Sequence, residues 1–216
     1  MKGIFIVFEG GEGTGKSTQI KRLKETLEAR KHKVHLTWEP GGTRLGEKIR
    51  NILLDPENKE LSARCEALLY AGARAQHASE VLWPALRRGE IVLCDRYIDA
   101  SRAYQGVGRN LGIAKIDEIN LWGAEGLIPH RVYLFDVDPN IGLERAKVSA
   151  SEKAFGGRLD RLEEEPMSFH EIVRQAYLYT ARQNPSRYRI IDASQSIDVI
   201  SQTLFKDVFE LLDQKS

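Results

Sequence analysis

The sequence predicts an α/β fold, with a mostly parallel five-stranded sheet and helices on both of its faces. Short apolar runs recur along the chain of 216 residues, and stretches with helical periodicity separate them. The runs occupy Ile4–Phe8, Val34–Trp38, Ile91–Cys94, Val132–Phe135 and Tyr188–Ile191. With 42% apolar side chains, a chain of this length can fill one core rather than two. We therefore expect a single domain over residues 1–216.

The first run, Ile4–Phe8, is followed by a glycine-rich octet. The run is continuously apolar, as in a parallel strand buried on both faces. The segment after the octet places Ile20, Leu23 and Leu27 on one helical face. The octet itself, Gly10–Ser17, reads Gly-Gly-Glu-Gly-Thr-Gly-Lys-Ser and fits the pattern of a phosphate-binding loop.

A loop of this kind binds nucleotide phosphates with three kinds of group. Backbone N–H groups of the loop and of the helix N-terminus surround the phosphate oxygens. The Lys16 ammonium reaches the outer phosphates, and the Ser17 hydroxyl suits a magnesium ion. The expected nucleotide-binding residues are Gly10, Gly11, Glu12, Gly13, Thr14, Gly15, Lys16, Ser17 and Thr18.

Two longer helical patterns follow. Between Leu61 and Leu86, apolar or small residues recur with helical spacing up to Gly89, which suits a left-handed cap, so we expect one long core helix. Its expected core-facing residues are Leu61, Cys65, Leu68, Gly72, Ala75, Leu82 and Leu86. A C-terminal helix is expected to bury Ile197, Ile200, Leu204, Val208 and Leu211. Residues 149–157 are small, polar and glycine-bearing, and predict a short lid at about 149–160.

Composition and charge exclude several classes of function. The formal net charge is +1, so no overall field attracts a nucleic acid or an anionic membrane. Cys65 and Cys94 lack metal-ligand spacing, and we expect two buried thiols in a reducing compartment. No cleavable signal precedes the first strand, and no apolar run reaches membrane-spanning length. We therefore expect a cytoplasmic protein that binds neither nucleic acid nor membrane.

Candidate metal ligands follow the third and fourth apolar runs. Asp95 and Asp136 come directly after these runs, and ligands of open α/β sheets gather at such strand ends. We prefer Asp95 because the next residue, Arg96, can grip a phosphate with two hydrogen bonds. Ser17 and Asp95 are thus the expected magnesium ligands, and Asp136 is expected to be structural. A local ion pair between Asp95 and Arg96 is the alternative.

Glu12 is unexpected inside a phosphate-binding loop, because its carboxylate repels a polyphosphate. Its side chain could turn away from the donor phosphates and accept a hydrogen bond from a hydroxyl group of a second substrate. It could equally be a solvated loop residue. The residues alone leave both interpretations open.

Five motifs in this order resemble those of bacterial thymidylate kinases, which have the P-loop kinase fold. The motifs are Gly10–Ser17 with an acid at position 12, Glu39-Pro40-Gly41-Gly42-Thr43, Asp95-Arg96-Tyr97, Ala103-Tyr104-Gln105-Gly106 and Arg158-Leu159-Asp160-Arg161. They extend over almost the whole chain. The resemblance implies transfer of the γ-phosphate of Mg-ATP to dTMP in dTTP synthesis by a homodimer. The nucleotide on the glycine-rich loop would then be ATP.

The resemblance also assigns residues to the base of dTMP. Tyr70 and Arg74 lie four residues apart and share a helical face. They match residues that stack on thymine and hydrogen-bond its carbonyl group. Ser101 and Gln105 match residues that touch the thymine edge, and Tyr104 matches the residue beneath the deoxyribose.

The sugar and phosphate of dTMP are assigned in the same way. Glu12 would hold the 3′-hydroxyl group, Arg96 would bind the acceptor phosphate, and Glu39 would fix Arg96 or a magnesium-bound water. No strong base is needed, because the acceptor phosphate has a second pKa near 6 and is already largely ionised at neutral pH. The chain departs from many relatives at Trp38, Ala100 and Arg102.

The expected catalytic residues are Lys16, Arg96 and a cation from the lid. With an acid at position 12, the loop lacks an arginine of its own, as in family members whose lid carries cations. We expect Arg158 in this role, ahead of Lys153 and Arg145. Arg161 could instead pair with Asp160 or Glu164 at the surface.

Two other functions are compatible with a phosphate-binding loop. One is phosphorylation of a nucleoside or of a different monophosphate by a related P-loop kinase. The other is a GTPase-like switch, which usually carries Asn-Lys-x-Asp and Asp-x-x-Gly motifs. Here Asn58-Lys59 is followed by Glu60 and Leu61, and no Asp-x-x-Gly occurs in the sequence. The switch is therefore disfavoured.

Overall fold

The computed structural model describes residues 2–150 and 158–214. Within these residues, five parallel strands form one sheet in the order β2-β3-β1-β4-β5. The strands are β1 (Ile4–Gly10), β2 (Val34–Trp38), β3 (Ile91–Asp95), β4 (Arg131–Asp136) and β5 (Tyr188–Asp192). The chain therefore has the predicted α/β architecture, and each strand falls where an apolar run predicted it.

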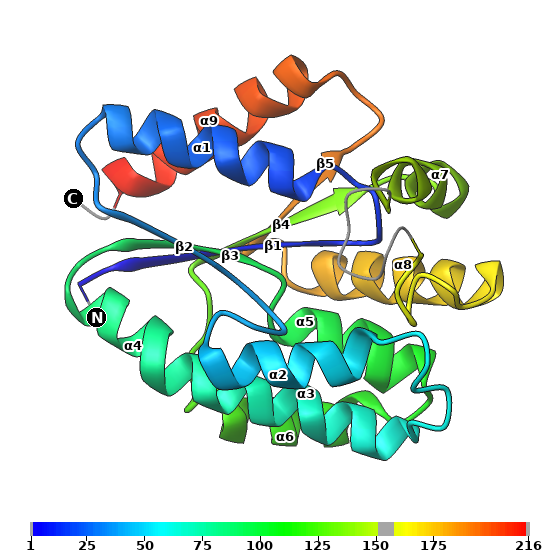
Figure 1. The fold of residues 1–216 in the computed structure, drawn as a ribbon. Coiled ribbons are helices and arrows are strands. Elements are labelled where there is room, and N and C mark those ends of the chain that lie inside the picture. The colour runs from blue at the N-terminus through cyan, green and yellow to red at the C-terminus, as the bar shows by residue number, and fades with distance from the viewer. Residues whose placement is uncertain (1, 151–157, 215–216) are drawn as a thin grey trace.

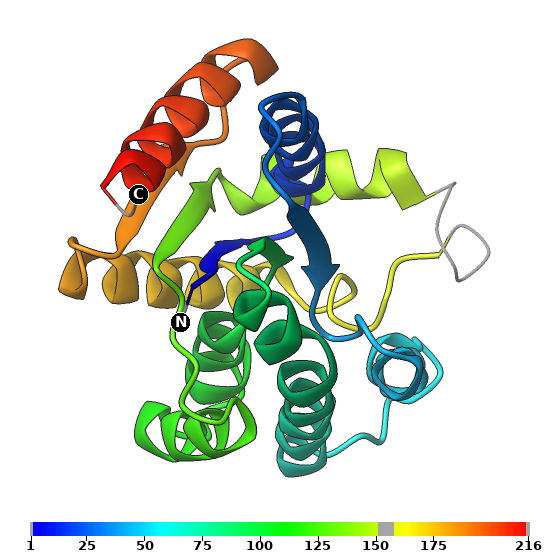
Figure 2. The same ribbon diagram turned by 90° about the vertical axis from the view of Figure 1, so that its left-hand side faces the viewer.

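Helices cover both faces of the sheet (Figures 1 and 2). The α-helices are α1 (Lys16–Ala29), α2 (Arg44–Leu54), α3 (Ala63–His77), α4 (Trp83–Arg87), α5 (Ile98–Ser101), α6 (Ile113–Gly123), α7 (Pro139–Ala150), α8 (Met167–Gln183) and α9 (Ile197–Asp213). Two π-helical segments, η1 (Ala78–Leu82) and η2 (Arg102–Gly108), continue α3 and α5.

The sheet separates two apolar cores. On one face, α1 and α9 lie side by side, and their buried side chains pack on those of β1, β3 and β4 (Figure 1). On the other face, α3, α4 and α8 pack against the opposite side chains of the same strands. Alternate residues of each strand thus enter different cores, for example Phe5 and Ile6 of β1. Because helices cover both faces of the sheet, the residues on both sides of a strand are apolar, and each strand is a continuous apolar run in the sequence.

The long helix predicted between Leu61 and Leu86 is present as α3, η1 and α4 in succession. Pro84 lies near the junction of the last two segments and has no N–H group to continue an α-helical ladder. The π-helical turn η1 directly precedes this point. Gly89 follows the helix with a φ angle of 81°, as expected for a left-handed cap.

The prediction of which face of this helix meets the core was wrong over the length of α3. Cys65 and Gly72 are exposed, and Leu68 is 61% exposed. The buried face carries Glu66, Ala67, Tyr70, Ala71, Ala73, Arg74 and His77. Helical spacing identifies stripes but does not decide which stripe meets the core, and here polar side chains find partners inside. Cys65 is therefore not the buried thiol that we expected, whereas Cys94 is buried.

The predicted lid is only partly described. Its first residues, 149 and 150, belong to the last turn of α7. Residues 151–157, which include Lys153, lie outside the described residues. Residues 158–166 run from there to α8 as an irregular segment. Among the helices that the structure describes, none is both long and apolar enough to cross a membrane.

Candidate active site

The glycine-rich loop joins β1 to α1 at the carboxyl edge of the sheet. Gly13 has a φ angle of 61°, and a Cβ atom there would lie 1.9 Å from the carbonyl oxygen of Gly142 in α7. A Cβ atom on Gly142 would in turn lie 2.4 Å from the carbonyl oxygen of Glu12. The loop and α7 therefore meet backbone to backbone, and glycine is required on both sides.

Lys16 lies across the inside of this loop. Its Nζ donates to the carbonyl oxygens of Gly10 and Gly11, at 3.2 and 2.8 Å, and to the Thr14 hydroxyl at 3.3 Å. Burial lowers the pKa of the Lys16 ammonium, and the neighbouring Arg96 lowers it further. These neutral acceptors are easily exchanged for phosphate oxygens, which attract a desolvated ammonium much more strongly.

Ser17 and Asp95 come together beside the loop, as the sequence predicted. The Ser17 Oγ donates to Oδ2 of Asp95 at 3.3 Å, while Oδ1 of Asp95 is buried and has no hydrogen-bond partner. A buried carboxylate oxygen left without a donor fits a site for a cation. No group of three His, Cys, Asp or Glu side chains suited to a metal exists in the described ranges.

Arg96 lies between the loop and a pocket next to it. Its backbone has a φ angle of 68°, which is uncommon for a residue with a side chain. The guanidinium donates to the Gly10 carbonyl oxygen at 2.9 Å, to the Tyr177 hydroxyl at 3.2 Å and to the Glu12 carboxylate at 2.6 Å. The Tyr104 hydroxyl donates to the same Glu12 oxygen at 2.9 Å. Glu12 therefore turns toward Arg96 and Tyr104 and not toward the centre of its own loop.

The pocket beside Arg96 encloses about 540 Å³ of empty space, part of it open to solvent. Side chains from the loop, the segment after β2, helices α2 and α3, and the segment after β3 line it. The lining residues are Glu12, Glu39, Pro40, Arg50, Leu54, Tyr70, Arg74, Arg96, Tyr97, Ala100, Tyr104, Gln105, Asp160 and Leu162. We call this the acceptor pocket. It brings together the predicted residues of α3, Tyr70 and Arg74, with Tyr104 and Gln105 of η2.

Arg74 is 1% exposed and is held by hydrogen bonds. Its guanidinium donates to Glu39 Oε2, Asn120 Oδ1, the Tyr97 carbonyl oxygen and the Ser101 hydroxyl. These bonds use four of its five N–H groups, so one remains for a ligand. Ser101 does not line the acceptor pocket but supports Arg74 from behind.

The glycine-rich loop lies next to the acceptor pocket, because Glu12 of the loop also lines the pocket. The family model described as "Thymidylate kinase" matches residues 8–204. The chain belongs to the thymidylate kinase family. Among curated relatives, the thymidylate kinase of Pelotomaculum thermopropionicum is 48% identical over 99% of this chain and 96% of its own. That of Pelobacter propionicus is 47% identical over 96% and 94%, respectively.

A solved structure of this family superimposes closely. The crystal structure of thymidylate kinase from Ehrlichia chaffeensis gives a TM-score of 0.77 at 28% sequence identity. The match covers 96% of this chain and all of the other. Sequence and fold comparisons therefore agree over nearly the whole chain.

Several family-based expectations can be compared with the contacts of this chain. The Glu39 carboxylate bonds Arg74 at 2.8 Å and His77 at 3.0 Å, so the arginine that it holds is Arg74 and not Arg96. The alternative of a local pair between Asp95 and Arg96 is not seen; Arg96 pairs with Glu12. Asp136 forms a two-bond ion pair with Arg174, in agreement with a structural role.

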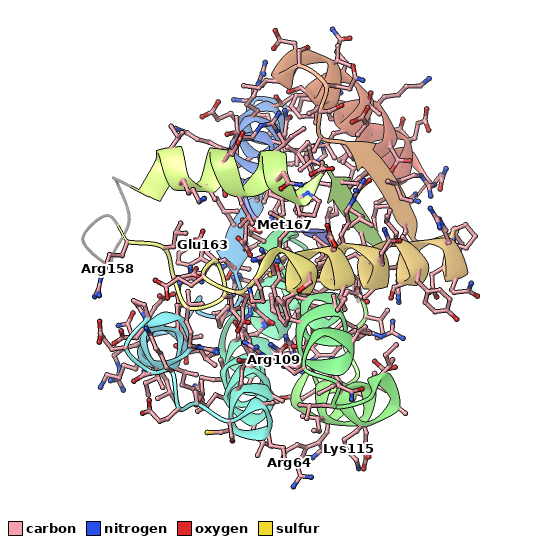
Figure 3. The ribbon with its side chains drawn as sticks, turned by 90° about the vertical axis from the view of Figure 1, so that its right-hand side faces the viewer. Arg64, Arg109, Lys115, Arg158, Glu163 and Met167 are labelled. Atoms are coloured by element: carbon pink, nitrogen blue, oxygen red, sulfur yellow. The ribbon has the colours of Figure 1, made fainter. Side chains whose placement is uncertain are left out.

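The arginines in and around the predicted lid lie in very different places. Arg158 projects from the outer edge of the molecule (Figure 3), where it pairs with Glu57 at 2.7 Å. Its side chain is 57% exposed and does not reach the glycine-rich loop. Arg161, expected to pair at the surface with Asp160 or Glu164, is instead buried against Glu66 at 2.6 Å. Arg145 bonds the carbonyl oxygen of Ala193.

The three departures from many relatives have different environments. Trp38 is 43% exposed and donates to Glu47 at 2.9 Å, and Arg102 pairs with Asp117 at 2.8 Å; neither lines the acceptor pocket. Ala100 does line it.

The sequence did not indicate several residues that line the acceptor pocket. These are Arg50, Tyr97, Asp160 and Leu162. Arg50 lies four residues before Leu54, which also lines the pocket, so the two share one face of α2, and this spacing could have indicated Arg50. Glu9 is a further residue of the site that the sequence did not indicate. Its carboxyl group is fully buried and accepts hydrogen bonds from the backbone N–H groups of Tyr97 and Ala100 and from the Tyr177 hydroxyl.

Glu9 makes the stability of the chain dependent on pH. Burial, together with the charge of Asp99, raises the pKa of its carboxyl group from 4.5 to about 8. The folded chain therefore keeps a proton that the unfolded chain releases, so the free energy of unfolding falls as pH rises from about 5 to 8. We expect Glu9→Gln, which cannot titrate, to show a smaller fall in urea unfolding across this range. The exposed Glu25→Gln is the control and should follow the unmodified chain. Parallel curves for Glu9→Gln and the unmodified chain would contradict the assignment.

Proposed function

We propose that this chain transfers the γ-phosphate of Mg-ATP to dTMP, giving dTDP and ADP. The observation that carries the proposal is the position of Glu12. It belongs to the loop that binds the donor, yet its carboxylate bonds Arg96 and Tyr104 at the edge of the acceptor pocket. A carboxylate there is suited to accept a hydrogen bond from a sugar hydroxyl group, whereas a bound donor triphosphate alone gives it no favourable partner.

On the donor side, the backbone of residues 10–15 and the N-terminus of α1 would bind the ATP phosphates. Lys16 would move from its carbonyl partners to the outer phosphates, and Thr18 lies exposed in the first turn of α1. Ser17 and Asp95 would hold the magnesium ion, which supplies positive charge to the phosphate oxygens when bound.

On the acceptor side, the ring of Tyr70 and the remaining N–H group of Arg74 would bind thymine. Gln105 would meet the edge of the base, and Ser101 would act by holding Arg74. Tyr104 would pack beneath the deoxyribose with Glu12 on the 3′-hydroxyl group. Arg96 would exchange its bond to Glu12 for the acceptor phosphate, which is bound more strongly because of its higher charge.

Transfer would depend on alignment and on positive charge. The in-line reaction has a loose transition state and needs little proton transfer from the protein. Arg96 and Lys16 both donate to the Gly10 carbonyl oxygen, so the two cations lie close together beside the loop, where both could reach the reacting phosphates. Both cations repel each other in the absence of anions, so a phosphate between them is favoured.

An acceptor comparison tests the proposed function directly. With Mg-ATP as donor, we expect kcat/KM for dTMP to exceed that for AMP, CMP and GMP by at least about a hundredfold. Lys16→Met is the control, and its kcat should fall about a thousandfold because it removes charge at the transition state. Its unfolding transition should change little. Equal turnover of all four acceptors would refute the proposal.

We also infer that Arg158 supplies a catalytic cation. Residues 160 and 162 of the same segment line the acceptor pocket, so Arg158 lies within a few residues of it. Its pair with Glu57 is exposed, and exposed ion pairs contribute little to stability, so it is readily exchanged for a phosphate.

Arg158→Ala should accordingly lower kcat by on the order of a hundredfold, with the KM for dTMP changing less than about threefold. Glu57→Gln removes only the surface partner of Arg158 and should leave kcat unchanged. Steady-state kinetics of the two variants decide the role. An effect of Arg158→Ala confined to KM would assign the catalytic cation to another residue.

We infer further that two copies of the chain associate through α3 and α6. The outward stripe of α3, Cys65, Leu68 and Gly72, lies next to α6, where Leu121 is 47% and Trp122 is 85% exposed. An apolar surface of this kind on adjacent helices is typical of a protein–protein interface.

The proposed use of ATP and dTMP favours a cytoplasmic location, and the two cysteines of the chain, Cys65 and Cys94, are free thiols, as is usual there.

Association can be measured by sedimentation equilibrium at micromolar concentration. We expect a dimer for the unmodified chain and a monomer for Leu68→Glu, because a buried, unpaired carboxylate opposes the contact. Val199→Glu, on α9 across the sheet, should remain dimeric. A dimer that persists in Leu68→Glu would contradict this interface.

A further inference from the structure

Glu66 is a fully buried carboxylate directly behind the acceptor pocket. It lies on the inward face of α3, one turn before Tyr70, and is 0% exposed. Three side chains from distant segments donate to it. Its partners are Gln105 Nε2 at 2.7 Å, Arg161 Nη2 at 2.6 Å and Arg109 Nε at 3.4 Å.

The charge of Glu66 is balanced by the two guanidinium groups. Arg161 is held from the other side by the carbonyl oxygen of Leu53 at 2.9 Å, and Arg109 also pairs with Glu165. A buried carboxylate is tolerated only with such partners. The two arginines are sufficient to compensate the negative charge of Glu66. Charge compensation therefore does not explain why the uncharged Gln105 amide also donates to this carboxylate.

The contact with Glu66 decides which way the Gln105 carboxamide faces. A carboxylate only accepts hydrogen bonds, so the group of Gln105 that faces it is the NH₂ donor. The carboxamide oxygen therefore faces elsewhere, and Gln105 lines the acceptor pocket. No described residue donates a hydrogen bond to this oxygen. Without Glu66, the two orientations related by a half-turn of the carboxamide would compete.

The orientation matters because of the hydrogen-bonding pattern of pyrimidines. Thymine presents an acceptor, O4, next to a donor, N3–H. Cytosine presents the reverse, an amino donor next to the N3 acceptor. Arg74 and Gln105 both line the acceptor pocket, and the bonds of Arg74 leave one N–H group of its Nη1 unused. A donor from Arg74 and the carboxamide oxygen of Gln105 would together complement thymine and not cytosine in the same pose.

We propose that Glu66 is a positioning residue for base selection: it holds the Gln105 carboxamide with its oxygen toward the base and thereby makes the acceptor pocket favour an N3–H pyrimidine over cytosine. The inference rests on the proposed function, because it takes a pyrimidine monophosphate as the occupant of the pocket. It assigns specificity to a side chain that does not line the pocket.

Glu66→Gln tests this assignment with minimal change of shape. A glutamine at this position can donate as well as accept, so it no longer fixes the carboxamide of Gln105. Titration calorimetry of the full chain with dTMP and with dCMP should show the ratio of their dissociation constants falling at least about tenfold, the equivalent of one hydrogen bond. The kcat for dTMP at saturation should change less than about twofold, because no group at the phosphates is altered.

Glu165→Gln is the matched control. It makes the same chemical change in the same ion cluster, but Glu165 contacts Arg109 and not Gln105. Its dTMP to dCMP ratio should equal that of the unmodified chain. A ratio that is unchanged in Glu66→Gln, or that falls equally in both variants, would overturn the proposal.

Glu66→Gln leaves two buried arginines with less countercharge, so its fold requires a separate check. The double variant Glu66→Gln/Arg161→Gln removes one positive charge together with the negative one, and it should fold and show the same fall in ratio. Loss of folding in both variants would make Glu66 a structural residue and overturn the proposal. If the unmodified chain itself fails to distinguish dTMP from dCMP, the proposed function fails instead, so the two failures are distinguishable.

Discussion

The parallel register of β1 and β3 determines how the two halves of the site meet. Phe8 pairs with Asp95, so the residues after each strand leave the sheet at the same level. The glycine-rich loop therefore begins beside Arg96, whose backbone N–H donates to the Phe8 carbonyl oxygen at 2.9 Å. A slip by one residue would turn Asp95 to the opposite face of the sheet, away from Ser17. The site thus depends on a sheet register that the apolar runs hold in place from both faces.

Beneath the acceptor pocket, the interior is polar where an α/β core is usually apolar. Arg74, Glu39, His77 and Thr37 form a hydrogen-bonded row in which each side chain is buried. Such a network costs desolvation energy unless every member is paired, and it then holds its members in one arrangement. The arrangement keeps Arg74 ready for a ligand before one binds, which reduces the ordering required on binding.

Local sequence patterns were sufficient for the sheet and the glycine-rich loop, whereas the side chains of the acceptor pocket were assigned through the family resemblance. Strands buried on both faces are continuous apolar runs, and a loop with fixed glycine positions has few alternative conformations. The family resemblance was needed for Tyr70, which periodicity alone would have placed in an ordinary core.

Contacts between distant segments could not be predicted from those patterns. Helical spacing showed stripes on α3 but not that its polar stripe faces inward, because that depends on partners such as Asn120 on α6. Arg161 looked like a surface residue next to Asp160 and Glu164, yet its partner Glu66 lies on another helix. The position of Arg158 beside Glu57 likewise depends on how two irregular segments pass each other.

The contact of Gly13 with Gly142 has a consequence for how sequences of this kind can diverge. Gly142 belongs to no nucleotide-binding motif, and its own φ angle imposes no need for glycine. Even so, any side chain at either position would collide with backbone, which unlike a flexible side chain has nowhere to move. Which residues the glycine-rich loop tolerates at position 13 therefore depends partly on α7, a helix that carries no nucleotide-binding motif. Exchanging that loop between family members without their α7 partner would transfer the motif but not the surface on which it rests.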